Sequence, residues 1–301
     1  MTRPASGNAP FYLPMSWPWF RKMFRAVLVS GLLAAALVSG PGCSAPPESL
    51  TDTRETLAGI IQDGITIPQF PSAADQLNYA RSGLAGRQEK MAALRAVKTL
   101  FGQDRMACGQ AALGLAYLHL EPQYRFASDL DIQRAIKDFQ AVANQYQDLP
   151  DVQAKALWYL GWIHTELAQD LKKAMGYYWQ VAKAFDHIPL SLSHTAPWVT
   201  LVYGLEPVHK MPQAPEKDWA QVALLEIVRH SPDTGEAIAA IHLLLDRYPA
   251  SQAAGLALKH MLADPVLAPH AQAPAADYLA KKPANPYLAR DIQTLAKAAA
   301  P

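Results

Sequence analysis

Residues 154–189 constrain the fold more than any other stretch, because they carry two helical patterns separated by a short break. Apolar or aromatic side chains recur at spacings of three and four, which places them on one face of each helix. These faces consist of Leu157, Leu160, Gly161 and His164 in the first helix, and of Ala174, Tyr178, Val181 and Phe185 in the second. Gly161 and Ala174 are small, so two antiparallel helices can approach closely there, and Pro189 ends the second helix.

The same helix pair recurs along the chain. Ala135, Phe139 and Val142 repeat the spacing of the second helix, and Pro150 follows Ala135 by 15 residues, as Pro189 follows Ala174. Leu113-Gly114 likewise repeats Leu160-Gly161. The pattern resembles the tetratricopeptide repeat (TPR), a helix-turn-helix unit of about 34 residues with Leu-Gly in one helix and Ala-x3-aromatic in the next.

This resemblance covers about residues 85–262 and implies an all-α fold, a right-handed superhelix (α-solenoid) of antiparallel helix pairs. One such unit cannot bury its apolar face alone, so about three or more should stack. Low Gly beside abundant Ala and Leu also favours helices over short strands. We therefore expect a TPR-like helical array.

Composition excludes several classes of protein. Half of the 301 residues are hydrophobic, which suffices for a sizeable core. Lys and Arg number 27 against 26 Asp and Glu, and without a basic run this balance argues against nucleic-acid binding. Two cysteines do not make a disulfide framework.

Residues 1–43 are expected to serve export. Basic residues between Arg21 and Arg25 precede an apolar run, residues 26–40, of signal-peptide length. The run is short for a membrane-spanning helix of about 20 residues, although an uncleaved anchor is an alternative. The Pro-rich, aromatic segment before Arg21 is unusual, and Met15 or Met23 would make a more ordinary start.

Gly42-Cys43, directly after the apolar run, resembles a bacterial lipoprotein processing site. The resemblance implies lipid attachment at Cys43, and Ser44 implies the periplasmic face of the outer membrane. Several acyl chains would give the stable attachment that one chain cannot. The site departs from the usual pattern because Gly40 stands where an aliphatic residue is common. The alternative is an ordinary signal peptide, with Cys43 a free thiol and the protein soluble in the periplasm.

Five regions follow from these patterns. They are the signal segment 1–43, a tether and irregular connector 44–71, an N-terminal TPR-like array 72–188, a Pro-rich insertion 189–215, and C-terminal TPR-like helices with a capping helix 216–301. Within them, residues 51–61 suggest a first helix and residues 64–72 a short extended piece. Residues 264–274 suggest a loop. Asn285-Pro286 predicts an N-cap followed by proline at the first helical position.

No catalytic motif occurs, and we expect neither an enzyme nor a bound metal or cofactor. His164 occupies an inward repeat position, where a core histidine is more common than a ligand. His187 and His194 flank the insertion and make only a weak metal pair. Cys108 lies in an apolar helix and is predicted to be a small buried side chain.

Trp158 and Trp162 lie one turn apart, beside the apolar face of the first helix of the best repeat. Lys155 and Thr165 fall on the same stripe. In TPR arrays this stripe lines the groove that binds partner peptides, and aromatic anchors suit that use. The alternative is that both tryptophans pack against the next helix pair. In the insertion, Trp198 and Tyr203 are candidate contact residues.

These features together predict a non-catalytic protein-binding scaffold of the bacterial cell envelope. The helical rhythm is similar to that of TPR lipoproteins of Gram-negative envelopes, such as those in outer-membrane assembly and the pilus-secretin pilotins. The implied partners are envelope proteins and, through the lipid, the membrane. The alternative is a solute- or glycan-binding lipoprotein with a pocket made by Trp198 and the Trp158–Trp162 stripe.

Overall fold

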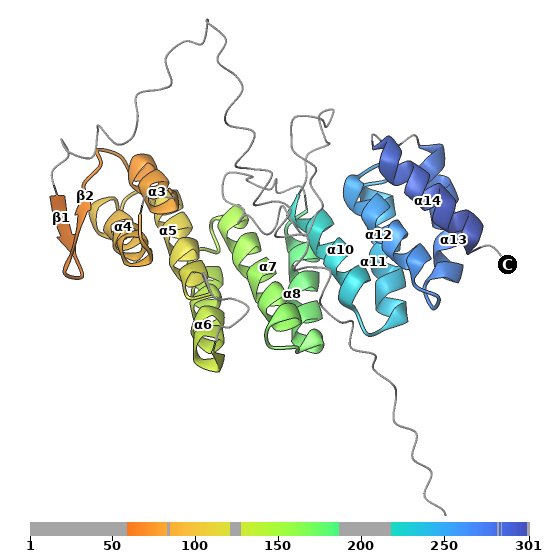
Figure 1. Ribbon diagram of the computed structural model, residues 1–301, viewed down its shortest axis with the longest axis horizontal. Helices are drawn as coiled ribbons and strands as arrows, with labels where there is room; N and C mark the ends of the chain where they lie inside the picture. Colours follow the sequence, from red (N-terminus) through yellow and green to blue (C-terminus); the bar gives the residue numbers. More distant parts are fainter. Residues whose placement is uncertain are drawn as a thin grey trace, which may run out of the picture. The chain divides into compact units, whose positions relative to one another are not determined.

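The computed structural model describes residues 59–82, 85–120, 128–186, 218–281, 283 and 285–299. Contacts divide the chain into two units, Met1–Thr56 and Leu57–Pro301, and everything described belongs to the second. Helices make up most of it (Figure 1). The prediction of a mostly helical protein is confirmed.

Eleven helices lie in the described residues. The first six are α3 (Ala73–Arg81), α4 (Arg87–Leu100), α5 (Arg105–Leu118), α6 (Asp129–Gln145), α7 (Pro150–Glu166) and α8 (Leu171–Ala184). The other five are α10 (Trp219–His230), α11 (Thr234–Arg247), α12 (Gln252–Ala263), α13 (Ala268–Ala280) and α14 (Pro286–Ala298). Residues 189–215, the predicted insertion, lie outside the described residues.

Most of these helices begin at a side chain that accepts a hydrogen bond from a backbone N–H of the first turn. The capping residues are Ser72, Asp104, Ser128, Asp170, Asp218, Asp233, Ser251 and Asn285. Such a cap satisfies a donor that has no partner within the helix. The predicted Asn285-Pro286 start of the last helix is confirmed.

A β-hairpin precedes the helices and corrects, at residues 59–61, the end of the helix expected over residues 51–61; residues 51–58 lie outside the described residues. Strand β1 (Gly59–Gln62) pairs antiparallel with β2 (Ile65–Pro68). Asp63 and Gly64 form the two-residue turn with φ of 54° and 77°, the positive values that such hairpins require. The Asp-Gly turn and the isoleucines outweigh the weak helical pattern, so part of the expected irregular connector 44–71 is a hairpin. The extended piece expected within residues 64–72 is confirmed.

Residues 264–274, expected to be a loop, contain the start of α13. Pro269 lies in the first turn, where its missing N–H would have no partner in the helix. Pro274 lies inside the helix, yet Ala271, Ala275 and Tyr278 are buried along one face. Burial of that face explains why the helix forms despite the proline.

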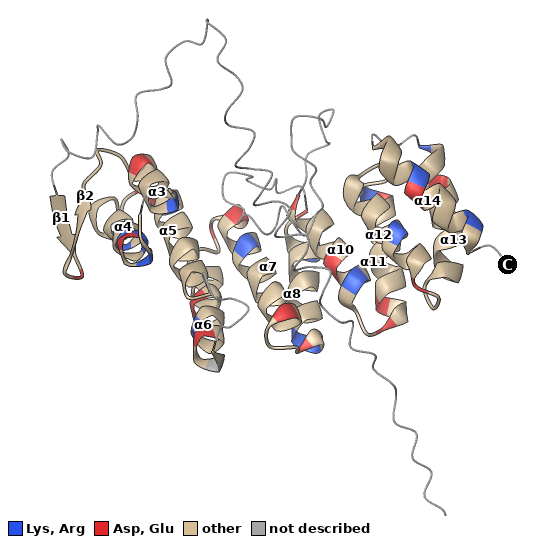
Figure 2. Cartoon of the chain, viewed as in Figure 1, with Lys and Arg blue, Asp and Glu red and all other residues tan. Residues whose placement is uncertain are grey.

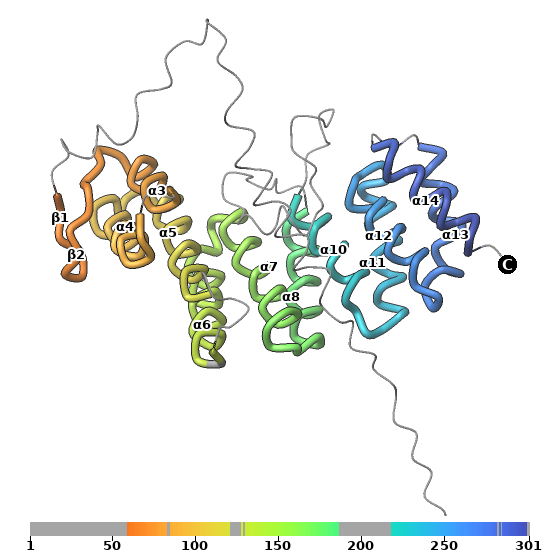
Figure 3. The backbone as a smooth tube through the Cα atoms, viewed as in Figure 1, coloured from red at the N-terminus to blue at the C-terminus, as the bar shows by residue number. Residues whose placement is uncertain are grey.

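Each helix packs against its neighbour in the chain (Figure 3). In addition, α5 contacts α7, α7 contacts α10, α10 contacts α12 and α12 contacts α14. The hairpin, α3, α4 and part of α5 share one hydrophobic core. A second core runs from α5 to α14. Cys108 belongs to this second core, as predicted, and burial raises the pKa of its thiol.

The small residues of the best repeat lie where α7 and α8 meet. Gly161 and Ala174 are both buried, and a Cβ placed on Gly161 would lie 2.5 Å from the ring of Tyr178. The predicted close approach is therefore confirmed. Gly114, which repeats the Leu-Gly pattern, has a different neighbour, because its added Cβ would meet Leu94 of the preceding helix α4.

Candidate functional site

The predicted binding stripe on α7 lies inside the protein. Lys155 is 4 % exposed, Trp158 1 % and Trp162 8 %, and Thr165 is half-buried. Helix α7 contacts α5, α6, α8 and α10, and no residue between its first and last positions is fully exposed. The expected exposed aromatic stripe is thus wrong for these side chains, and the alternative of packing describes them better.

Aromatic contacts show what Trp158 packs against. Its ring centroid lies 6.3 Å from that of Trp219 on α10 and 5.6 Å from that of Tyr159. The indole Nε1 of Trp219 donates to Asp151 Oδ1 on α7 at 2.7 Å. These contacts join the first helices of two successive pairs. The tryptophans therefore act in packing between helices.

Lys155 places an amine in this buried region. Burial, and to a smaller extent the nearby Arg81, lower the pKa of Lys155 to about 7, while Asp151 acts in the opposite direction. Arg81 on α3 donates from Nη2 to Gln110 Oε1 on α5 at 3.1 Å. A buried lysine with this pKa carries little net charge above neutral pH, which reduces the cost of enclosing it.

Thr165 and His164, near the end of α7, interact within the α7–α8 pair, one by a hydrogen bond and the other by ring stacking. Thr165 donates from Oγ1 to the carbonyl of Gly161 at 3.0 Å, and the ring of His164 stacks on Tyr177 with centroids 5.6 Å apart. Burial lowers the pKa of His164, and its Nδ1 has no hydrogen-bond partner among the described residues. The buried position predicted for His164 is confirmed.

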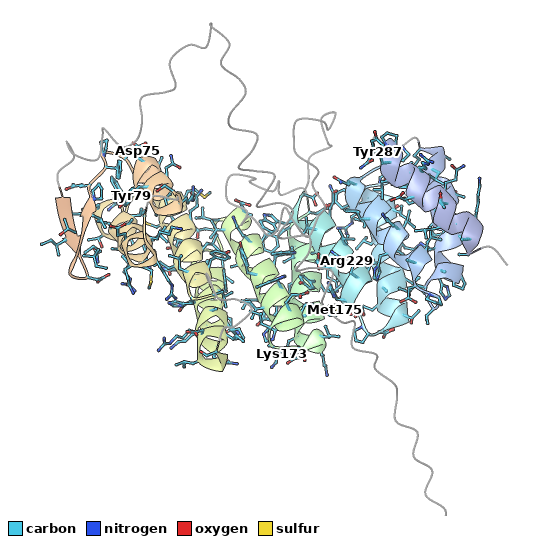
Figure 4. All side chains as sticks on the ribbon, in the orientation of Figure 1. Asp75, Tyr79, Lys173, Met175, Arg229 and Tyr287 are labelled. Atoms are coloured by element: carbon cyan, nitrogen blue, oxygen red, sulfur yellow. The ribbon has the colours of Figure 1, made fainter. Side chains whose placement is uncertain are left out.

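Glu226 on α10 is a buried carboxylate that the sequence pattern did not indicate. It is 3 % exposed and lies 3.1 Å from His230 Nε2 and 3.6 Å from Arg229 Nη1, one turn further along the helix. Figure 4 labels Arg229 on α10. Both partner side chains are partly exposed, so they connect the buried carboxylate to the surface.

A second group missed from the sequence joins three helices. The hydroxyl of Tyr248, at the end of α11, donates a hydrogen bond to Asp186, after α8, and the carboxylate of Asp218, the N-cap of α10, lies close enough to contribute to the raised pKa of Tyr248. Tyr248-Pro249 was interpreted only as the end of a helical unit. The signal that could have found this group is the pair of aspartates at the two ends of the insertion.

Charge and metal-ligand residues do not concentrate at any described site. Figure 2 shows Lys and Arg, in blue, and Asp and Glu, in red, scattered over the helices. Within the described part of the chain, no three His, Cys, Asp or Glu side chains are arranged to hold a metal ion. None of the helices described is long and apolar enough to cross a membrane. Cys43, Trp198, Tyr203, His187 and His194 lie outside the described residues.

Comparison of the chain with protein-family models, curated proteins and solved structures finds no match in any of the three.

Proposed function

We propose that this chain is a TPR-like scaffold that binds proteins of the bacterial envelope, attached by lipid at Cys43 to the periplasmic face of the outer membrane. The order of helix contacts supports the proposal. The helices form the pairs α5–α6, α7–α8, α10–α11 and α12–α13, followed by α14. The first helices α7, α10 and α12 each pack against the second helix of their own pair and against the second helix of the preceding pair. Each also contacts the first helix of the preceding pair and the first helix that comes next, which for α12 is α14. A stack of repeated helix pairs has this contact order.

The unequal packing of first and second helices also fits a curved array. Successive first helices, α5, α7, α10 and α12, contact one another. Among the described elements, contacts of comparable extent do not join α6 to α8 or α8 to α11, and the second helices α11 and α13 contact each other less extensively than the first helices α10 and α12. If the first helices lie closer together than the second ones, a stack bends around the first helices.

One glycine contact recurs in two helix pairs. An added Cβ on Gly161 of α7 would lie 2.5 Å from the ring of Tyr178 on α8. An added Cβ on Gly255 of α12 would lie 2.4 Å from the hydroxyl of Tyr278 on α13. In both pairs a glycine of the first helix receives a tyrosine of the second. This recurrence supports the interpretation of the pairs as copies of one unit.

The burial of Lys155, Trp158 and Trp162 on α7 restricts the surface to which a partner could bind. Because Trp158 and Trp162 are buried, partner contacts are proposed for the exposed or half-exposed surface of the array. The glycan-binding alternative needs an exposed aromatic platform, and the tryptophans of α7 do not supply one in the described structure. The scaffold is therefore the function we favour.

The lipid anchor is tested with labelled palmitate. Cys43→Ser should abolish incorporation of the label and release the protein from the membrane fraction. Cys108→Ser is the matched control, because Cys108 is buried in α5 and its replacement should leave labelling intact. Equal labelling of wild type and Cys43→Ser, or no labelling of the wild type, would contradict the proposed anchor.

Partner binding is tested by photo-crosslinking in intact cells. A photoreactive residue replaces the half-exposed Gln110 or Lys259 on first helices, or the exposed Arg134 or Lys173 on second helices. We expect discrete crosslinked envelope proteins, mainly from the first-helix positions. Absence of any crosslinked protein at all four positions, with the chain folded and localised, would overturn the scaffold proposal.

A further inference from the structure

Strand β1 forms an open edge of the hairpin. Within the described residues it pairs with β2 alone, and Figure 1 shows it on the side of the hairpin away from the helices. Its sequence, Gly-Ile-Ile-Gln, contains neither a charged residue nor a proline. Ile61 is 77 % exposed, and Gly59 is exposed as well. Proteins usually protect such an edge with charge, proline or a covering segment, and the described part of the chain places none of these on β1.

The outer edge of β2, in contrast, is already engaged. Pro68 has no backbone N–H, and its carbonyl accepts a hydrogen bond from Gln76 Nε2 on α3 at 3.2 Å. Oε1 of the same amide accepts from the backbone N–H of Phe70 at 3.1 Å, and Gln76 is fully buried. That edge is left with Thr66 as a pairing residue, which is too little for a second ladder. Further pairing of the described sheet is therefore favoured at β1.

The inner face and the turn hold the hairpin against α4. Ile67 is 1 % exposed, and Ile60 and Ile65 pack against the same hydrophobic core. In the turn, Asp63 Oδ2 lies 2.6 Å from Arg95 Nη1 on α4. A segment that is ordered before binding loses less conformational entropy when it binds. The edge of β1 is thus preformed for pairing with another strand.

The turn determines which backbone groups of β1 face outward. Gln62 and Ile65 flank the two-residue turn, and such residues form a hydrogen-bonded pair. Hydrogen-bonded and non-hydrogen-bonded pairs alternate along an antiparallel ladder. The N–H and C=O groups of Ile61 and Gly59 therefore point away from β2, toward the position of a third strand.

We propose that β1 pairs antiparallel with β1 of a second copy of this chain, about a two-fold axis at Ile60. In this register each Ile61 lies opposite Gly59 of the second copy, and the two residues form a hydrogen-bonded pair. Glycine has no side chain, so the exposed Ile61 is accommodated over it. The uncharged edge also suits a second copy, because like charges directly opposite each other would destabilise the pairing.

This pairing gives a closed and weak dimer. The same residues serve both copies, so the interface is isologous, and the engaged outer edge of β2 prevents further growth. Strands of four residues make a small interface, below the roughly 1,200–2,000 Å² of stable complexes. We therefore expect association that depends strongly on protein concentration. The dimer depends neither on the proposed lipid anchor nor on the binding of envelope proteins.

The first test is sedimentation equilibrium of the purified full-length chain in detergent over a range of concentrations. The wild type should approach the mass of a dimer at the highest concentrations. Ile61→Lys changes an exposed side chain and should weaken self-association by about tenfold or more, because lysine protects natural edge strands. Thr66→Lys, exposed on β2 opposite Ile61, is the matched control and should associate like the wild type. A monomeric wild type, unchanged association of Ile61→Lys, or equal weakening in both variants would overturn the pairing.

Cysteine crosslinking tests the register independently. On the two-fold axis the Cα atoms of Ile60 in the two copies would lie about 4.5 Å apart, a distance that a disulfide can span. In a chain with Cys43 and Cys108 replaced by Ser, mild oxidation of Ile60→Cys should give a covalent dimer. Thr66→Cys should not, because three strand spacings place it roughly 14 Å or more from its counterpart. Equal crosslinking of the two variants, or none in Ile60→Cys while circular dichroism shows it folded, would overturn the two-fold pairing.

Discussion

The contact between Gly161 and Tyr178 supports a sharp prediction about the α7–α8 pair. Replacing Gly161 by Ala adds one methyl group, whose carbon would lie 2.5, 2.8 and 2.9 Å from three atoms of the Tyr178 ring. These distances lie well inside the separation of about 3.5–4.0 Å at which two carbon atoms attract. The ring is fully buried and cannot move aside freely. The two helices must therefore separate.

The magnitude combines two opposing effects. Alanine favours a helix over glycine by about 1 kcal/mol. Overpacking a close-packed core costs about 1–3 kcal/mol, and more where a rigid ring is displaced. Gly161→Ala should thus be neutral to destabilising by about 2 kcal/mol. A second Gly→Ala variant, at a helix position with free space around it, gains the same helix propensity. The difference in stability between the two variants therefore reports the overpacking alone.

Gly176 on α8 is that site, because an added Cβ has no atom within 4 Å. Gly176→Ala should stabilise the protein by about 0.5–1 kcal/mol. Urea unfolding followed by far-ultraviolet circular dichroism gives both free energies. We expect Gly161→Ala to be about 1–3 kcal/mol less stable than Gly176→Ala. Equal stability of the two variants would refute the close approach of α7 to Tyr178.

Three further predictions follow from buried or bracketing residues. Trp158→Ala should destabilise the fold by about 3–5 kcal/mol, measured by urea unfolding, because the indole is buried against Trp219; an effect below about 1 kcal/mol would contradict its packing role. For Lys155, the unfolded state binds more protons between the folded pKa of about 7 and the ordinary lysine pKa of about 10.4, so its contribution to stability rises with pH over that range. Lys155→Met should remove this rise and stabilise the protein near pH 7, by an amount on the order of a few kcal/mol, in unfolding curves at several pH values; an unchanged pH dependence would show that the amine is not buried. Replacing residues 187–217 by a short flexible linker should preserve helix content and change the unfolding free energy by only about 1 kcal/mol, because α8 and α10 pack against each other directly; cooperative loss of helix would show that the segment holds the array together.

Much of the helical architecture could be predicted from the sequence because its signals are local. Spacings of three and four identify the helix faces, and Ser, Asp and Asn before apolar runs mark helix starts that the structure shows as side-chain caps. The small residues Gly161 and Ala174 also indicated the close α7–α8 contact. These features depend on residues that are near one another in the chain.

Local signals failed where tertiary contacts decide the outcome. Periodicity places Trp158 and Lys155 on one side of α7 but does not show which helix covers that side, so a stripe predicted to be exposed is buried against α10. The helix containing Pro274 forms because burial of its other face outweighs a poor local propensity.

The sequence by itself indicated most of the helices, the Asn285 cap of α14 and the small residues at which α7 and α8 meet, since each depends on neighbours within a few turns. Only the tertiary structure decided which of those helices enclose Lys155 and that the hydroxyl of Tyr248 donates to Asp186. The physical reason is that burial and charge proximity depend on segments far apart in the chain, whose meeting no local spacing records.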